Sequence, residues 1–250
     1  MASPGFADHF SAQAQGYARH RPGYPDALFD ALLNVTPGRH RAWDCGCGNG
    51  QVARGLAAHF DEVLASDPSA AQLAARDGTS GISYLQATAA PAPLATASCD
   101  LVTVGQALHW FPLDAFFAEA RRVLRPGGVL AAWCYSLLRV APRIDTLLDR
   151  FYRERLGPWW PAERALVDAG YRDLAFPFTP LPMPELAIEV AWNLEELGGY
   201  LATWSAYQRC RNETGLDPLP GLLGQLAMPW GDPSQTRRVR WPLHLRVGRA

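Results

Sequence analysis

Apolar residues alternate between two spacings from residue 24 to residue 136. Short apolar runs, typical of buried strands, are separated by segments whose apolar positions recur at helical spacing. The runs predict strands at 42–45, 62–66, 82–86, 101–104 and 129–135. The helical spacing predicts helices at 24–34, 51–60, 69–76 and 114–124. Such alternation predicts βαβ units, a parallel sheet and right-handed crossovers.

The pattern changes after residue 136. Eleven of the 21 prolines lie beyond residue 157, and amphipathic helices are expected at 144–156 and 194–207. A terminal strand is expected at 239–247. We therefore expect residues 137–236 to form a mostly helical cover, inserted between the fifth strand and a strand within 237–250 that returns to the sheet.

Composition and charge narrow the classes of protein to which this chain can belong. The chain has 250 residues, 48% of them hydrophobic, with 23 basic and 24 acidic side chains and a net charge of -1. This balance disfavours a protein dedicated to nucleic acid or to an anionic membrane. We find no targeting segment and no apolar run near the ~18 residues that a membrane span needs. The five scattered cysteines suit free thiols in a reducing compartment, so we expect a cytoplasmic protein.

A glycine-rich loop follows the first predicted strand. Residues 44–50 read Asp-Cys-Gly-Cys-Gly-Asn-Gly, and a predicted helix follows. Glycines allow a tight turn and close approach of a ligand to the helix N-terminus. The dinucleotide pattern G-x-G-x-x-G fails because position 51 is Gln51, and no lysine marks a phosphate-binding P-loop. The leading Asp44 suits a ligand with a cationic amino-acid end.

A second acidic residue ends the next predicted strand. Asp67 stands 17 residues after Gly50, where a carboxylate can accept both hydroxyls of a ribose. Alternatively, the glycines form only a tight turn and Asp67 only caps a helix. The agreement of loop, strand context and spacing favours a nucleoside site.

These motifs resemble the class I S-adenosylmethionine-dependent methyltransferases. Further segments resemble the type-11 subgroup near trans-aconitate methyltransferase: 17–25, 106–111, 124–128, 199–205 and 241–249. The resemblance implies an α/β, Rossmann-like fold with a seven-stranded mixed sheet, helices on both faces and a C-terminal cover. It also implies four parts: a lid arm (1–23), a cofactor-binding core (24–136), a substrate cover (137–236) and a terminal strand (237–250).

The resemblance implies that S-adenosyl-L-methionine binds here and leaves as S-adenosyl-L-homocysteine. It assigns cofactor contacts to one set of residues: Tyr17, Arg21, Asp44, Gly46, Gly48, Gly50, Asp67, Pro68, Ala87, Thr88, Ala89 and Gln106. The family often has an acidic residue near position 90, where this chain has Ala90. Backbone groups would then have to contact the adenine amine.

Methyl transfer from a sulfonium is an in-line displacement that depends on alignment and on exclusion of water. A base is needed only when the acceptor starts protonated. His109 is the candidate general base; alternatively it shapes the site. Aromatic residues are candidates for a substrate pocket, with core packing as the alternative for each: Trp110, Tyr135, Trp159, Trp160 and Trp204. Arg139 and Arg143 could neutralise an acidic substrate or lie on the surface.

Several functions stay open on the sequence. We favour a methyltransferase, monomeric or homodimeric, that acts on a carboxylate or hydroxyl of a small molecule. The alternative is a non-catalytic cofactor-binding or regulatory protein on the same fold. A nucleic-acid methyltransferase is disfavoured by net charge and by the absence of an Asn/Asp-Pro-Pro-aromatic motif after the fourth strand. We expect no metal, because Cys45 and Cys47 lack zinc-ligand spacing.

Overall fold

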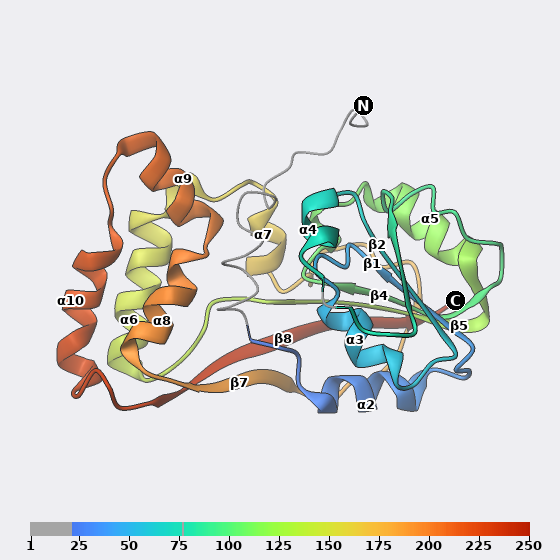
Figure 1. The fold of residues 1–250 in the computed structure, drawn as a ribbon, viewed down its shortest axis with the longest axis horizontal. Helices are drawn as coiled ribbons and strands as arrows, with labels where there is room; N and C mark the ends of the chain where they lie inside the picture. The colour runs from blue at the N-terminus through green and yellow to red at the C-terminus, as the bar shows by residue number, and fades with distance from the viewer. Residues whose placement is uncertain (1–21, 77) are drawn as a thin grey trace.

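A mixed eight-stranded sheet forms the centre of the computed structural model, which describes residues 22–76 and 78–250 (Figure 1). The strand order is β3-β2-β1-β4-β5-β8-β6, and β7 also pairs with β8. Strands β1 to β5 are parallel, whereas β8 is antiparallel to β5. The strands are β1 (Arg41–Cys45), β2 (Glu62–Asp67), β3 (Ile82–Gln86), β4 (Cys99–Gly105), β5 (Leu124–Tyr135), β6 (Thr179–Pro180), β7 (Leu186–Trp192) and β8 (Arg237–Arg249).

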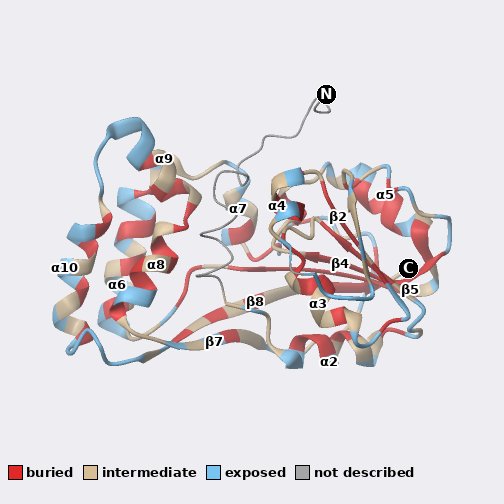
Figure 2. Cartoon of the chain, in the orientation of Figure 1, coloured by how far each residue is buried: buried red, intermediate tan, exposed pale blue. Residues whose placement is uncertain are grey.

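Helices cover both faces of the parallel strands, as expected. Leu28 of α2 (Asp26–Val35) and Leu56 of α3 (Gln51–Ala57) are fully buried in one apolar cluster. Phe116 of α5 (Leu113–Val123) is fully buried in the cluster on the other face. The buried sides of these helices face the sheet (Figure 2). The amphipathic spacing seen in the sequence is therefore the packing surface of each helix.

A short helix beside the parallel strands begins with a side-chain cap at Ser69. The Ser69 hydroxyl accepts the Gln72 backbone N–H at 3.3 Å at the start of α4 (Ala70–Ala74). The cap satisfies one of the N–H groups that a helix start leaves without a partner. A 3-10 turn, η2 (Leu108–Trp110), follows β4.

The long strand β8 connects the core to the C-terminal helices. Its residues 243–249 pair with β5, and its residues 237–243 pair with β7. The Trp241 indole N–H donates to the Tyr200 hydroxyl at 3.0 Å, which ties β8 to α8. The elements here are α6 (Pro142–Arg150), η3 (Phe151–Arg155), η4 (Gly157–Trp159), α7 (Arg164–Asp168), α8 (Leu194–Ala202), α9 (Ser205–Thr214) and α10 (Leu219–Trp230).

The structure corrects several expectations for residues 137–250. The mixed sheet has eight strands; two of them, β6 and β7, have no counterpart among the strands predicted by range, and both pair with β8. The helix expected at 144–156 ends as an α-helix at Arg150 and continues as the π-helical turn η3. The helix expected at 194–207 breaks between Ala202 and Ser205. The four-part division of the chain stays a prediction.

A backbone turn causes the break between α8 and α9. Both the backbone N–H and the hydroxyl of Thr203 donate to the Tyr200 carbonyl, at 2.9 and 2.7 Å. The turn buries the Trp204 side chain, which is 5% exposed.

Among the described residues, no helix combines the length and apolar character that crossing a bilayer requires.

Candidate functional site

A cavity of about 800 Å³ lies at the carboxyl ends of the parallel strands. The loops after β1, β2, β3 and β4 line it on one side, and α7 and the turn between α8 and α9 line it on the other. Open α/β sheets bind ligands at this edge. The volume is in the upper part of the range for small-ligand sites, so the cavity has room for a cofactor and an acceptor.

The glycine loop closes one end of this cavity. Gly46, Gly48 and Gly50 have φ values of 69°, 54° and 85°, a region that other residues rarely adopt. A Cβ on Gly46 would lie 2.8 Å from the Ala107 Cβ and 2.9 Å from the Phe111 ring. Of the three glycines assigned to the cofactor, Gly46 and Gly48 line the cavity, whereas Gly50 is the N-cap of α3 and does not line it.

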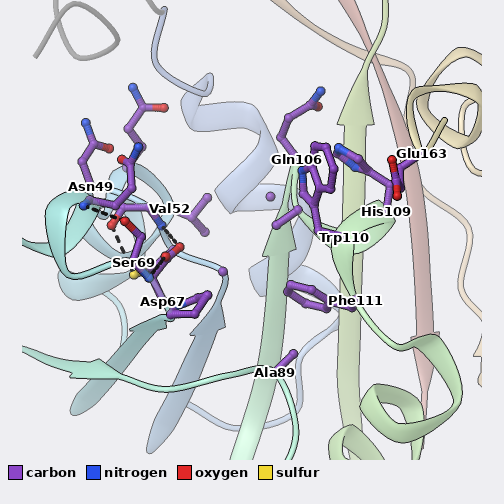
Figure 3. A pocket seen from close by; sticks show the side chains of 18 of the residues that line it. Asn49, Val52, Asp67, Ser69, Ala89, Gln106, His109, Trp110, Phe111 and Glu163 are labelled. Carbon is purple, nitrogen blue, oxygen red and sulfur yellow. Dashed lines mark hydrogen bonds between the residues drawn. The ribbon is translucent and has the colours of Figure 1, made fainter. Parts of the chain in front are cut away.

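The Asp67 carboxylate is held in place at the end of β2. It is 9% exposed, and it accepts the backbone N–H of Gly48 at 2.9 Å and that of Ser69 at 2.8 Å (Figure 3). A carboxylate oxygen has two lone pairs and can accept more than one hydrogen bond. Asp67 and the adjacent Pro68 both line the cavity.

Asp44 is a buried carboxyl beside the same loop. It accepts the Thr103 hydroxyl at 3.0 Å and the Ala53 backbone N–H at 3.1 Å. Burial raises the pKa of Asp44 from 3.8 to about 7, and the negative charge of Asp67 adds to this rise. A cationic ligand group next to Asp44 would favour the charged carboxylate.

The loops after β3 and β4 complete this half of the cavity. Ala87, Thr88 and Ala89, which the resemblance assigns to the cofactor, line it. Gln106 also lines it, with an unusual φ of 56°. Its side-chain oxygen accepts the Tyr135 N–H at 2.8 Å, and its amide donates to the Tyr135 carbonyl at 3.4 Å. Gln106 therefore fixes the loop after β4 against β5.

His109 lies in η2, and its environment disfavours the general-base role. Its Nδ1 is 2.8 Å from the Tyr171 hydroxyl, and the residue is 8% exposed. Burial, with a smaller contribution from the charge of Arg164, lowers the pKa of His109 to about 3. A histidine with this pKa is neutral near pH 7 and accepts protons poorly. The geometry favours the alternative, that His109 shapes the site.

Aromatic residues line the opposite half of the cavity. Trp110, Tyr135, Trp160 and Trp204 line it, and the Trp160 and Trp204 rings lie 5.7 Å apart. Trp159 does not line the cavity; it packs against the apolar core instead.

The sequence analysis missed a cavity arginine and its neighbours. Arg139, one of the two arginines considered, pairs with Asp149 at 2.9 Å, and the other, Arg143, is exposed; neither lines the cavity. Arg164 lines it instead. No local motif marks Arg164, because the five-residue α7 reaches the cavity only through the tertiary fold.

Known proteins resemble this chain in sequence and fold. A family profile described as a methyltransferase domain matches residues 43–132. A Dictyostelium discoideum protein, provisionally named a methyltransferase, is 31% identical over 221 residues, which cover 87% of this chain and 84% of that protein. The chain belongs to the class I S-adenosylmethionine-dependent methyltransferases. A solved structure from Anaeromyxobacter dehalogenans, provisionally named a type II methyltransferase, matches this methyltransferase with 47% identity and a TM-score of 0.86. The match covers 92% of this chain and 97% of that one.

A partial relative carries a more specific name. The malonyl-[acyl-carrier protein] O-methyltransferase of Enterobacter lignolyticus is 42% identical over 106 residues. The match covers 41% of this chain and 42% of the relative, so the two share less than half of their lengths. The assignment to the subgroup near trans-aconitate methyltransferase stays a prediction.

The residues around the glycine loop fit the family's cofactor, S-adenosylmethionine. The glycines leave a cradle that a side chain at Gly46 would fill, Asp67 presents acceptors for hydroxyls, and Asp44 can carry a charge opposite to an ammonium. The predicted cofactor residues Tyr17 and Arg21 lie outside the described part of the chain. Within that part, no group of three or more His, Cys, Asp and Glu side chains is arranged to hold a metal ion.

Proposed function

We propose that this methyltransferase transfers the methyl group to a carboxylate or hydroxyl oxygen of a small molecule. The observation that carries the proposal is the continuity of one cavity. The cavity runs from Asp67 and the glycine loop to an aromatic pocket formed by Trp160 and Trp204. Concave sites with aromatic walls are typical of small ligands.

The residues of the site perform alignment more than proton transfer. Bound S-adenosylmethionine supplies an electrophilic methyl group on a positively charged sulfur. Asp67 would hold the ribose hydroxyls, and Asp44 would face the cationic amino end. Gln106 is hydrogen-bonded to Tyr135 and fixes the loop after β4 against β5. This would position η2 beside the acceptor. Precise placement of the acceptor and removal of water supply much of the rate in such a displacement.

Residues 137–236 would act as the substrate cover. Trp160, Arg164, Tyr200 and Trp204 all come from this segment and line the cavity. The cover then decides which acceptor fits, while the core decides which cofactor binds. Oxygen as the acceptor atom agrees with the name of the partial relative from Enterobacter lignolyticus, an O-methyltransferase.

Isotope transfer tests this proposal. The purified protein is incubated with S-adenosylmethionine carrying a labelled methyl group and with a metabolite extract passed through a 3-kDa filter. Label is expected in new small molecules, with S-adenosylhomocysteine formed in equal amount. The Asp67→Ala variant is expected to lose most of this transfer. Label found only in added protein or nucleic acid, or binding without transfer, would contradict the proposal.

A further inference from the structure

Arg164 is a cation inside the aromatic half of the cavity. Its guanidinium carbon lies 4.9 Å from the centre of the Trp160 ring and 5.4 Å from that of the Tyr152 ring. Its side chain is 19% exposed. It is the one arginine among the described residues that line the cavity. Cationic groups stack favourably on aromatic faces, so these rings fix the plane of the guanidinium.

The partners of Arg164 lie on one edge of its guanidinium. Nε donates to the Tyr152 hydroxyl at 2.6 Å and lies 3.4 Å from the Asp168 carboxylate. The Tyr152 hydroxyl in turn donates to Asp168 at 2.7 Å. Among the described residues, the hydrogen bonds of Arg164 use Nε, which leaves the two terminal nitrogens to bind an oxyanion.

Glu163, which precedes Arg164 in the sequence, also lines the cavity (Figure 3). It is exposed to solvent, where water and salt screen its charge. The other two carboxyls that line the cavity, Asp44 and Asp67, belong to the cofactor half. Asp168 balances the charge of Arg164 from its Nε edge and does not line the cavity, so this half offers an anion the two terminal nitrogens of Arg164 as donors.

His109 presents a hydrogen-bond donor to the same half. We assign the Tyr171 hydroxyl as the donor in its 2.8 Å hydrogen bond with the His109 Nδ1, because burial raises the pKa of Tyr171 and the phenol keeps its proton. A neutral imidazole with Nδ1 as acceptor carries its proton on Nε2. His109 lines the cavity and its Nδ1 is occupied, so Nε2–H is the polar group that it can offer to an acceptor.

We infer that the methyl acceptor is a carboxylic acid with an apolar body, its carboxylate held between the terminal nitrogens of Arg164 and the Nε2–H of His109. This inference rests on the proposed function and specifies its substrate class. The apolar body would pack against Trp160 and Trp204. Helix α7, which begins at Arg164, packs against η2, which holds His109, so the two donors converge from core and cover.

The chemistry balances without a base. One carboxylate oxygen accepts the two donors, and the other attacks the methyl carbon in line with the carbon–sulfur bond. A carbon–oxygen bond forms, the carbon–sulfur bond breaks, and its electron pair stays on sulfur. The products are a methyl ester and S-adenosylhomocysteine, and no proton moves. A hydroxyl acceptor would need a base, and His109 is a poor one, because its pKa is about 3 and its Nδ1 is hydrogen-bonded to Tyr171.

Matched acids and amides test the inference. The protein saturated with S-adenosylhomocysteine is titrated by calorimetry with 3-phenylpropanoate and octanoate, and with 3-phenylpropanamide and octanamide. The acids are expected to bind at least tenfold more tightly than the amides. Arg164→Gln is expected to weaken acid binding about 10- to 100-fold, the range for a charge-assisted hydrogen bond. The Arg164→Lys variant should keep part of the preference for acids over amides. The variant Arg143→Gln, at an exposed position, should keep all of that preference.

A second readout separates substrate class from catalysis and from folding. The affinity for S-adenosylhomocysteine and the unfolding midpoint of each variant show whether the fold and the cofactor site survive. The acids mixed with S-adenosylmethionine are expected to yield methyl esters by mass spectrometry. Equal binding of acids and amides, an acid preference that survives Arg164→Gln, or methylation at an atom other than the carboxylate overturns the inference. Methylation of neutral acceptors alone would overturn it while leaving the proposed function intact.

Discussion

The Asp44→Asn variant should gain stability relative to the wild type with rising pH, while it loses cofactor affinity. The pKa of Asp44 is about 7 in the folded protein and 3.8 in the unfolded chain. The folded state therefore binds this proton more tightly, and the stability of the wild type falls as pH rises from about 4 to 7. The shift of about 3 pKa units corresponds to roughly 4 kcal/mol in total. The amide of the substituted side chain cannot ionise, so the variant escapes this loss.

Urea unfolding of the cofactor-free protein between pH 5 and pH 8 measures the effect. The stability of Asp44→Asn relative to the wild type should increase by about 3 kcal/mol over this interval, because part of the loss already occurs below pH 5. The exposed Asp173→Asn is the matched control and should show no such increase. An Asp44→Asn difference that changes by less than about 1 kcal/mol would refute the assignment of a strongly raised pKa.

The same substitution should weaken the binding of S-adenosylmethionine at pH 8. The carboxylate that faces the cationic amino end is lost, and charge-assisted hydrogen bonds of this kind correspond to about 10- to 100-fold in affinity. In the wild type, affinity should rise with pH up to about 7, because binding favours the deprotonated Asp44. Calorimetry in buffers of different ionisation enthalpy should detect proton release near pH 6.5. If the affinity of the wild type for S-adenosylmethionine does not depend on pH, the amino end of the cofactor does not lie beside Asp44.

Three further substitutions test the rest of the site. Asp67→Ala should weaken cofactor binding about 10- to 100-fold, because the ribose hydroxyls lose a charged acceptor; unchanged affinity by calorimetry would contradict this role. The turnover rate at saturating cofactor should not change between pH 6 and pH 9, because the pKa of His109 is about 3. A fall in rate below about pH 6.5 that disappears in His109→Gln would instead support His109 as the general base. Gly46→Ala should lower stability by at least about 1–2 kcal/mol in thermal unfolding, because its φ is 69° and the new methyl would lie 2.9 Å from Phe111. Gly78→Ala, which meets nothing within 4 Å, is its control.

The core of the fold could be predicted because the residue patterns that mark its strands and helices are local in the sequence. Each parallel strand is a short apolar run, and each crossover helix has one apolar face, so element type follows from a few neighbouring residues. Strands β6 and β7 could not be predicted in the same way, because prolines interrupt the apolar pattern there. Pro180 lies within β6, and Pro182 and Pro184 precede β7. The break at Thr203 depends on its two hydrogen bonds to one carbonyl, which apolar spacing does not reveal.

The cofactor half of the site was predictable for the same reason. Gly46, Gly48 and Asp67 form a compact motif in which chain order and spatial order agree. The acceptor half combines residues far apart in the sequence, as in the contact between His109 and Tyr171, 62 positions apart. Arg164 and Tyr171 have roles only through tertiary packing, so no pattern along the chain indicates them.

Co-crystallisation with S-adenosylhomocysteine tests the central claim most directly. The nucleoside is expected to lie across Gly46 and Gly48, with both ribose hydroxyls within hydrogen-bonding distance of the Asp67 carboxylate. Electron density that places the ribose at another edge of the sheet, or a cavity that stays empty at saturating ligand, would contradict the account.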